Sequence, residues 1–292
     1  MTSKALLDAI AGALGQPVCV SGRLRGGDIC ISYRMTLQDG RTVFVKTHDA
    51  APRGMFEAEA DGLAWLRVDG APRVPRVFTH ALASPDRPAF LVLEYVELGE
   101  RGPTYDEHLG RGLAALHRTH VPRFGWNRNN FIAVLPQANP PSENWGEFYQ
   151  SARLAPLLER AQHVGRMPPS LRRRFETLFS RLPTLIGPEE PPARLHGDLW
   201  TGNAICDNKG QPCLIDPAVY GGHREMDLAM MRLFGGFSET TFAAYHEAYP
   251  LYPGHEQRLP LYQLYPLLVH LILFGGSYLA AVEAALTRLL PS

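Results

Sequence analysis

The chain has 292 residues, of which 45% are hydrophobic and 20% are charged, a composition typical of a globular protein with enough apolar side chains for a core. Its 29 basic and 29 acidic side chains give a formal net charge of zero. Non-specific nucleic-acid binding and adhesion to an anionic membrane surface both require an excess of basic groups. We therefore expect neither a nucleic acid nor a membrane among the partners.

The cysteines and the ends of the chain indicate a cytoplasmic protein. Four cysteines have the spacing of neither a disulfide framework nor a structural zinc site. The first 17 residues show a short apolar periodicity without the basic start of a secretory signal, which predicts an amphipathic helix. The apolar segment 264–282 contains Pro266, His270 and two glycines, so a pair of buried helices is favoured over a membrane span.

The first third of the chain predicts a lobe rich in strands. Residues 29–37 and 42–46 alternate around Asp39-Gly40, a dipeptide typical of a two-residue hairpin turn. Residues 55–68 then have helical spacing, and residues 89–96 form an apolar run typical of a buried strand.

Beyond residue 99 the pattern is mostly helical, beginning with a predicted helix over 105–117. We therefore expect an α+β fold with a small β-rich lobe over residues 1–96 that contains one main helix. A larger, mostly helical lobe is expected over residues 97–292.

The order and spacing of polar residues between 196 and 216 indicate phosphoryl transfer. His196 stands two residues before Asp198, Asn203 follows five residues after Asp198, and the apolar run 213–215 leads to Asp216. A kinase uses one carboxylate to accept the proton of the attacking hydroxyl, and oxygen ligands to hold Mg²⁺ against the nucleotide phosphates. Each residue alone would more often be structural, but the combination predicts a catalytic loop.

A phosphate-binding lysine is expected upstream, and the sequence has a candidate. The chain contains only three lysines, and one of them, Lys46, follows the strand-like run 43–45. Glu59 lies on the helix predicted next and is a candidate partner for this lysine. The glycines at 22–27, including Gly26 and Gly27, could cover the phosphates with backbone amides.

With these residues in place, the sequence resembles the fructosamine/ketosamine kinase family of the protein-kinase-like superfamily, which also includes aminoglycoside phosphotransferases and choline kinases. The resemblance covers essentially the whole chain and rests on the following blocks: FVK (44–46), MFEAE (55–59), VPRV (74–77), HGDLWTGN (196–203), IDPAVY (215–220), REMDLAM (224–230), LFGGF (233–237) and PLYQL (260–264). The tryptophan after His-Gly-Asp-Leu separates this family from the antibiotic kinases. The resemblance implies a two-lobe, protein-kinase-like fold.

The resemblance also implies roles for individual residues. Asp198 would accept the proton, Asn203 and Asp216 would bind Mg²⁺, and Lys46 with Glu59 would position ATP. The backbone of Glu94, Tyr95 and Val96 would form the hinge that binds adenine. The family phosphorylates the 3-hydroxyl of ketosamines, on small molecules or on glycated proteins. The unstable 3-phosphate then eliminates and returns the free amine, so the implied role is deglycation.

Candidates for binding the acceptor are less specific. Trp200 is expected to stack on the sugar, with a core tryptophan as the alternative. Asn130 and Trp145 lie in a segment that resembles the acceptor side of the family. Asp227 is expected to brace the catalytic loop, and His196 to fix that loop rather than act as a base.

Cys30 lies in the predicted phosphate loop, where nearby groups could lower the pKa of its thiol. We therefore weigh a redox-linked homodimer against a monomer in which Cys30 is a small buried residue. Two alternatives to a ketosamine kinase stay open at this stage: a kinase of the aminoglycoside or choline type, and an inactive nucleotide-binding module.

Overall fold

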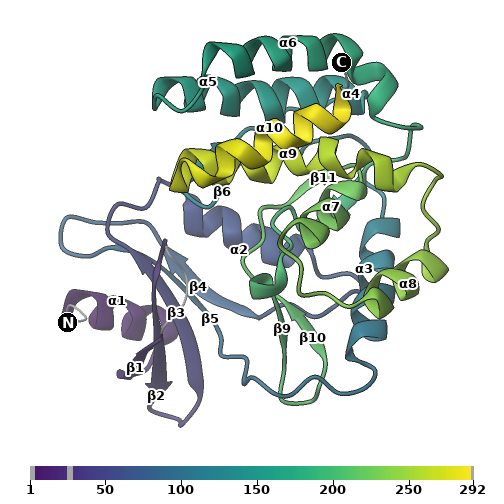
Figure 1. Cartoon of the computed structure of the whole chain (residues 1–292). Helices are drawn as coiled ribbons and strands as arrows, with labels where there is room; N and C mark the ends of the chain where they lie inside the picture. The colour runs from purple at the N-terminus through teal and green to yellow at the C-terminus, as the bar shows by residue number, and fades with distance from the viewer. Residues whose placement is uncertain (1–3, 25–28, 291–292) are drawn as a thin grey trace.

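A five-stranded antiparallel sheet forms the N-terminal part of the chain in the computed structural model, which describes residues 4–24 and 29–290 (Figure 1). Its strands run in the order β1-β2-β3-β5-β4. They are β1 (Val18–Leu24), β2 (Ile31–Leu37), β3 (Thr42–His48), β4 (Val77–Ala81) and β5 (Ala89–Glu94). The hairpin and the buried strand expected from the sequence are therefore present.

The turn between β2 and β3 differs from the expected two-residue turn. The pairing of Thr36 with Thr42 continues to a hydrogen bond from the Leu37 N–H to the Arg41 carbonyl of 2.8 Å, so three residues, 38–40, form the loop. Gly40 has φ +84°, a left-handed conformation that closes three-residue hairpin loops. The Asp-Gly signal located the hairpin correctly, but its loop is one residue longer.

Two helices cover opposite faces of this sheet. α1 (Lys4–Leu14) buries Leu6 and Ile10 against strand residues that include Val43 and Val45. α2 (Met55–Trp65) packs on the other face, where Leu91 and Leu93 of β5 join its core. Because side chains alternate along a strand, β3 presents Val43 and Val45 to α1 and Lys46 to the α2 side.

The C-terminal part is mostly helical, as expected. Its helices are α3 (Tyr105–Arg118), α4 (Trp145–Phe148), the π-helix η1 (Tyr149–Leu154), α5 (Ala155–His163), α6 (Pro169–Leu185), the 3₁₀ turn η2 (Thr201–Asn203), α7 (Glu225–Phe234), α8 (Glu239–Ala248), α9 (His255–Phe274) and α10 (Ser277–Leu289). Three short antiparallel pairs join them: β6 (Asn130–Ile132) with β7 (Leu135–Gln137), β8 (Ala193–Leu195) with β11 (Tyr220–Gly222), and β9 (Ala204–Cys206) with β10 (Pro212–Leu214).

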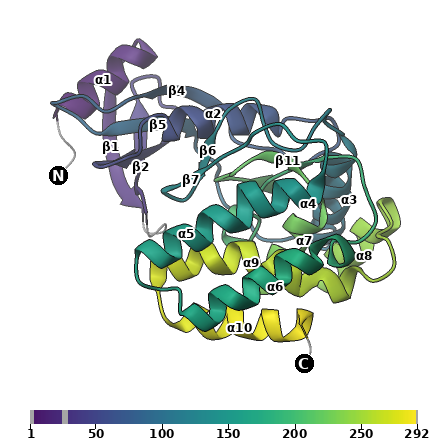
Figure 2. The same ribbon diagram turned by 90° about the horizontal axis from the view of Figure 1, so that it is seen from above.

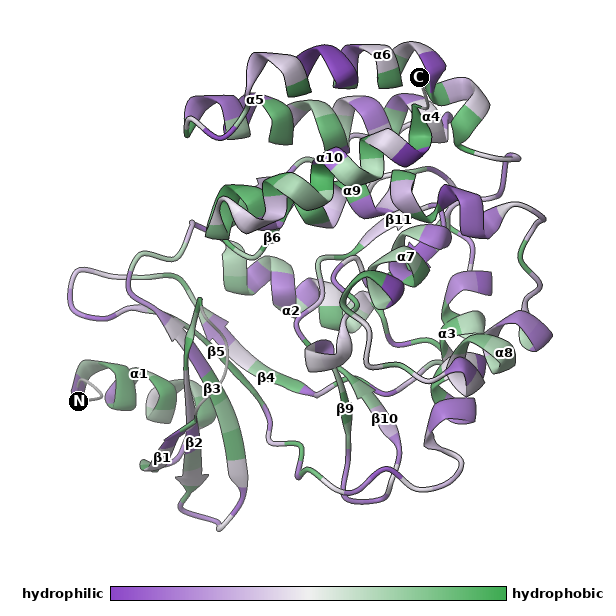
Figure 3. Cartoon of the chain, in the orientation of Figure 1, coloured by the Kyte–Doolittle hydropathy of each residue, from purple (hydrophilic) through white to green (hydrophobic). Residues whose placement is uncertain are grey.

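The apolar segment near the C-terminus is a pair of core helices. α9 and α10 meet at Gly275-Gly276, and they lie beside α5 and α6 (Figure 2). Most residues along α9 and α10 are apolar, whereas α6 carries more polar residues (Figure 3). Over residues 4–24 and 29–290, no helix has the length and apolar character needed to cross a membrane.

Candidate active site

Lys46 lies at the centre of an ion cluster between the sheet, α2 and the segment after β10. Its Nζ is 2.7 Å from Oε1 of Glu59 and 2.5 Å from Oδ1 of Asp216, a residue 170 positions away in the sequence. Burial alone would lower the pKa of Lys46, but the charges of Asp216 and Glu59 outweigh that effect and raise it. The ammonium therefore stays charged in a site where only 7% of its side chain is exposed.

The catalytic loop brings Asp198 and Asn203 together as their spacing predicts. The 3₁₀ turn η2 reverses the chain, and Nδ2 of Asn203 donates to the carbonyl of Asp198 at 2.8 Å and to its Oδ2 at 3.2 Å. The amide nitrogen of Asn203 is thus directed at Asp198. The Oδ1 of Asn203 consequently remains available as an oxygen ligand.

The environment of Asp198 favours its protonated form. Burial, followed by the charge of Asp216, raises the pKa of Asp198 to about 7. A carboxylate with a pKa near neutrality can take a proton from a hydroxyl and release it later, which suits a general base. The structure therefore supports the proton-accepting role expected of Asp198.

His196 and Asp227 hold the loop by hydrogen bonds. The carboxylate of Asp227 accepts the N–H groups of His196 at 2.7 Å and Gly197 at 2.9 Å, and it also contacts Nε2 of His117 at 3.1 Å. His196 contacts the Ile215 carbonyl through Nε2 at 2.9 Å, and burial lowers the pKa of this histidine. Asp227 therefore braces the loop through its backbone N–H groups. The neutral ring of His196 is hydrogen-bonded to the backbone, so it fixes the loop and is not positioned to act as a base.

Asp216 has an unusual backbone conformation that aims its side chain into the same site. Its φ is +55°, in the left-handed region, and the preceding N–H of Ile215 donates to the carbonyl of Asn203 at 3.0 Å. Oδ2 of Asp216 has no hydrogen-bond partner among the described residues. Together with Oδ1 of Asn203, it supplies the carboxylate and amide oxygens that Mg²⁺ prefers, so the donor set fits this ion.

The hinge segment contributes fewer free backbone groups than expected. The N–H of Glu94 already donates to the Arg76 carbonyl at 2.8 Å, so it is not available to a ligand. The N–H of Val96, in contrast, has no partner within the described part of the chain. An adenine donor is therefore expected from Val96 and not from Glu94.

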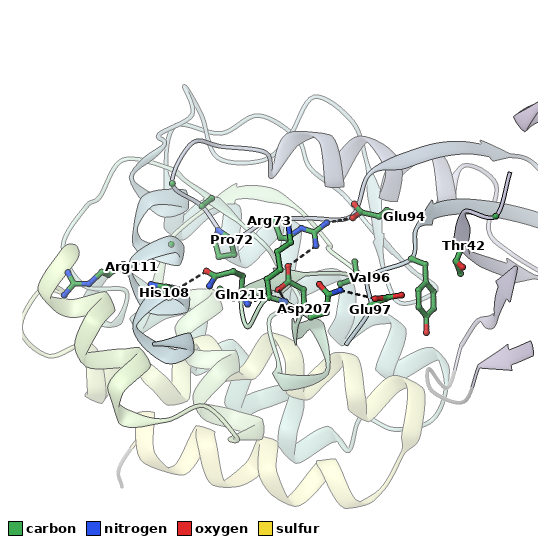
Figure 4. A pocket seen from close by; sticks show the side chains of 18 residues that line it. Thr42, Pro72, Arg73, Glu94, Val96, Glu97, His108, Arg111, Asp207 and Gln211 are labelled. Carbon is green, nitrogen blue, oxygen red and sulfur yellow. Dashed lines mark hydrogen bonds and ion pairs between the residues drawn. The ribbon is translucent and has the colours of Figure 1, made fainter. Parts of the chain in front are cut away.

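The Glu94 side chain points into a groove away from the catalytic cluster. Arg73 forms ion pairs with Glu94 and with Asp207, which lies between β9 and β10 (Figure 4). The groove, about 1030 Å³ in volume, is lined by Glu94, Tyr95 and Val96 but not by Lys46 or Asp198. Arg73 consequently ties the hinge to the C-terminal part of the chain.

The comparisons with known proteins agree with this geometry. A family model described as fructosamine kinase matches residues 3–292. The chain belongs to this family. It is 38% identical over 262 residues to an Enterococcus faecium protein assigned provisionally as a ketoamine kinase, covering 89% of this chain and 92% of the relative. It is 34% identical to the ketosamine-3-kinase of Mus musculus, covering 89% and 92% of the two chains.

Solved structures confirm the expected protein-kinase-like fold. A Thermobifida fusca protein, provisionally assigned as a fructosamine-3-kinase, superposes with a TM-score of 0.88 at 38% identity, over 99% of this chain and 100% of the other. A spectinomycin phosphotransferase superposes with a TM-score of 0.58 at 15% identity over 99% and 92% of the chains, which is a likeness of fold alone. As a member of the fructosamine kinase family, the chain is a phosphotransferase with a hydroxyl acceptor.

Trp200 is the acceptor-side candidate that remains accessible. It is 42% exposed, and its indole folds over Gly202. A Cβ built at Gly202 would lie 2.3 Å from the indole Cη2, so this glycine is needed for the ring to take its position. An indole face exposed two residues beyond Asp198 is suited to stack on a sugar.

Trp145 and Asn130 are not accessible, which contradicts the expectation that they contact the acceptor. Trp145 is 5% exposed, its ring centroid lies 5.3 Å from that of Tyr149, and its indole N–H donates to the Tyr262 hydroxyl. Asn130 is 4% exposed and donates to the Val219 carbonyl at 2.8 Å. Their segment packs behind the site, because its aromatic and amide groups are satisfied within the core.

The expectation of a lowered pKa at Cys30 is wrong. Burial raises the pKa of its thiol to about 11, an effect that the charge of Lys46 only partly offsets. The fraction of reactive thiolate at neutral pH is therefore small. Gly26 and Gly27, expected to cover the phosphates, lie outside the described residues.

Some residues of the site could not be found from motifs. Arg128, in the loop before β6, pairs with Glu57 and Asp61 on α2, on either side of Glu59. Gln137 and Arg153 belong to a buried network behind Asp216. No local spacing signals the contacts of Arg128 with α2 or of Gln137 with the Ala218 carbonyl, because each joins segments far apart in sequence.

Proposed function

We propose that this chain uses ATP and Mg²⁺ to phosphorylate the 3-hydroxyl of ketosamines. The observation that supports the proposal best is the convergence of Lys46, Glu59, Asp198 and Asp216 on one site in a member of the fructosamine kinase family. Fructosamine, ribulosamine and erythrulosamine adducts are the candidate acceptors. The relatives named for ketosamine and ribulosamine substrates support this class.

In this proposal, the residues of the chain divide the reaction among them. Lys46, held by Glu59, binds the α- and β-phosphates, and Asp216, which contacts Lys46, would be a ligand of the metal. The Val96 N–H binds adenine, and Trp200 stacks on the sugar so that its 3-hydroxyl faces Asp198. Mg²⁺, held by Asn203 and Asp216, neutralises the charge of the phosphates when bound.

The proton of the acceptor goes to Asp198, and the phosphoryl group goes to the acceptor oxygen. Asp198 accepts the proton of the 3-hydroxyl while that oxygen forms a bond to the γ-phosphorus. The bond from the γ-phosphorus to the bridging oxygen of ADP breaks, and the electron pair leaves with ADP. The products are ADP and the ketosamine 3-phosphate, whose elimination would return the free amine and complete a deglycation.

The proposal includes the cellular setting expected from the sequence. The described cysteines are all free thiols, which supports a reducing, cytoplasmic compartment. A monomer acting on free ketosamines or on glycated proteins is the simplest arrangement. The division into an ATP-binding lobe (1–96) and a catalytic lobe (97–292) is part of the same proposal.

A substrate panel tests the proposed reaction. ADP release would be measured with a synthetic ketosamine, an aminoglycoside and choline, and the position of the new phosphate would be determined by ³¹P and ¹³C NMR. We expect magnesium-dependent turnover of the ketosamine with phosphate on the 3-oxygen. Phosphorylation at another position, or turnover of choline or the aminoglycoside only, would refute the assignment.

A further inference from the structure

A buried network of polar side chains lies directly behind the segment that follows Asp216. Its members come from the β6–β7 region, from η1 and from α9, and each is at most 5% exposed: Asn130, Gln137, Asn139, Arg153 and Tyr265. Polar groups buried to this degree are costly unless they are fully hydrogen-bonded. A cluster of five such side chains is therefore expected to serve a structural or functional purpose.

The network ends on two backbone carbonyls of the catalytic segment. Nδ2 of Asn130 donates to the carbonyl of Val219 at 2.8 Å, and Nε2 of Gln137 donates to the carbonyl of Ala218 at 3.0 Å. On the other side, the Ala218 N–H donates to the carbonyl of His196 at 2.9 Å. Residues 218 and 219 are thus held between the network and the catalytic loop.

Every amide in the network has a defined orientation. Oδ1 of Asn130 accepts from Gln137 and from Asn139, each at 2.8 Å, and the Tyr265 hydroxyl donates to Oε1 of Gln137. Gln137 therefore uses both hydrogens of its amide and its oxygen. Replacing the amide of Asn130 or of Gln137 by a carboxylate would remove hydrogen-bond donors that no other group of the network can supply.

Arg153 anchors the far end of the network, and among the described residues it forms no ion pair with an acidic group. Its guanidinium donates to Oδ1 of Asn139 and to the Ala138 carbonyl, both at 2.7 Å, and it stacks 3.8 Å from the centre of the Tyr220 ring. This arginine belongs to the π-helix η1, a local irregularity that often marks functional sites. The guanidinium thus orients the amide of Asn139 and packs against Tyr220, the residue that follows 218–219.

We propose that this network is a positioning device for Asp216: Asn130 and Gln137, oriented by Tyr265, Asn139 and Arg153, hold residues 218–219 so that the Asp216 carboxylate stays aimed at the metal. The inference rests on the proposed role of Asp216. Because Asp216 has a left-handed backbone conformation, its aim depends on constraints on both sides. The catalytic loop supplies one constraint, and the network supplies the other.

Two tyrosines provide a matched test. Tyr265→Phe removes the hydroxyl that orients Gln137, whereas Tyr149→Phe removes the hydroxyl of an equally buried tyrosine, which donates to the Leu261 carbonyl at 2.7 Å and not to Gln137 or to residues 218–219. Mn²⁺ would be titrated calorimetrically into each full-length variant saturated with a non-hydrolysable ATP analogue. We expect Tyr265→Phe to weaken Mn²⁺ binding roughly 3- to 10-fold, and Tyr149→Phe to leave it unchanged, although both lower the melting temperature.

Gln137→Glu is a second, isosteric variant, since it keeps the shape but removes both donors. It should weaken Mn²⁺ binding more than Tyr265→Phe and raise the Mg²⁺ concentration needed for half-maximal turnover. Equal Mn²⁺ affinities in Tyr265→Phe, Tyr149→Phe and the parent protein would overturn the inference. Asp216→Asn separates the two proposals: if this variant binds Mn²⁺ and turns over like the parent, Asp216 does not hold the metal and the inference fails, whereas the substrate panel decides the proposed reaction.

Discussion

At the scale of single residues, the ionisation of Asp198 links catalysis to stability. The carboxylate must be ionised to accept a proton, yet burial and Asp216 raise its pKa to about 7. In the proposed reaction, catalysis therefore uses a group in an environment that destabilises its active form. Such a conflict is typical of active sites.

This conflict predicts a pH profile. We expect kcat/KM of the free enzyme to rise with pH through about 7, and to fall roughly tenfold per pH unit well below that value, because only the ionised Asp198 accepts the proton. The rate would be measured at subsaturating acceptor between pH 5 and 9. A profile that is flat between pH 6 and 8 would contradict a pKa near 7 for the base in the free enzyme.

Asp198→Asn should reduce kcat by roughly 10²- to 10⁴-fold while keeping nucleotide binding. Because the folded-state pKa of Asp198 lies above its unfolded value, the parent protein loses stability as pH rises from about 4 to about 7. The asparagine variant lacks this loss. Thermal unfolding should therefore show it to be more stable than the parent at pH 8 and equal to it at pH 3.

The cysteines allow a direct test of thiol reactivity. Cys19 is exposed, whereas burial raises the pKa of Cys30 to about 11. We expect iodoacetamide at pH 7.5 to alkylate Cys19 well before Cys30, as followed by peptide mass spectrometry. Faster labelling of Cys30 would show that its thiolate is stabilised and would revive the redox-linked dimer.

At the scale of elements, α2 is held against the C-terminal part of the chain at several points. Arg128 pairs with Glu57 and Asp61, and the guanidinium of Arg194 lies 4.9 Å from the centre of the Trp65 ring. Glu59 depends on this placement, since it reaches Lys46 from α2. The helix thus places Glu59 beside Lys46, and several contacts with the C-terminal part of the chain hold the helix in place.

Gly62 shows how closely α2 approaches the catalytic segment. A Cβ at Gly62 would lie 3.3 Å from Cγ2 of Val219, whereas a Cβ at Gly12 of α1 would meet nothing within 4 Å. Gly12→Ala should stabilise the protein by about 0.5 to 1 kcal/mol, because alanine favours a helix. Gly62→Ala should lose that gain and raise the KM for ATP, since α2 and Glu59 must shift.

Chemical denaturation and ATP kinetics on both variants check this expectation. An unchanged KM for ATP in Gly62→Ala, together with the same stabilisation as Gly12→Ala, would show that α2 has room to spare at this contact. The comparison is matched, because both substitutions add one methyl group to a helical glycine.

At the scale of the whole molecule, two buried ion pairs link elements distant in the sequence. Arg258 of α9 contacts Glu225 at the start of α7, and Arg224 contacts Glu190 before β8. In the Arg258–Glu225 pair the side chains are 10% and 3% exposed, so neither charge is solvated if its partner is lost. Breaking one such pair is costly because it leaves an uncompensated buried charge.

Glu225→Gln should therefore lower the free energy of unfolding by about 3 to 5 kcal/mol. Glu239→Gln breaks the exposed pair with Arg232 and should cost only about 0 to 1 kcal/mol. Urea denaturation of both variants measures the difference. Similar costs for the two substitutions would mean that the buried glutamate finds other partners or water.

The sequence by itself determined the chemistry and the order of the main elements. Asp198, Asn203 and Asp216 were recognised because they lie within 19 positions, where a loop and a short hairpin fix their relation. The alternation of β3 and the apolar pattern of 264–282 predicted structure correctly, because local periodicity reflects which side faces the core.

Only the tertiary structure decided which polar residues serve the site directly. Trp145 and Asn130 lie in the core and not on the acceptor side, and burial raises the pKa of Cys30, for which a lowered pKa was expected. The tertiary structure also connected Tyr265 through Gln137 to the segment after Asp216. The physical reason is that burial and long-range hydrogen bonds depend on the packing of distant segments, which leaves no spacing to detect in the chain.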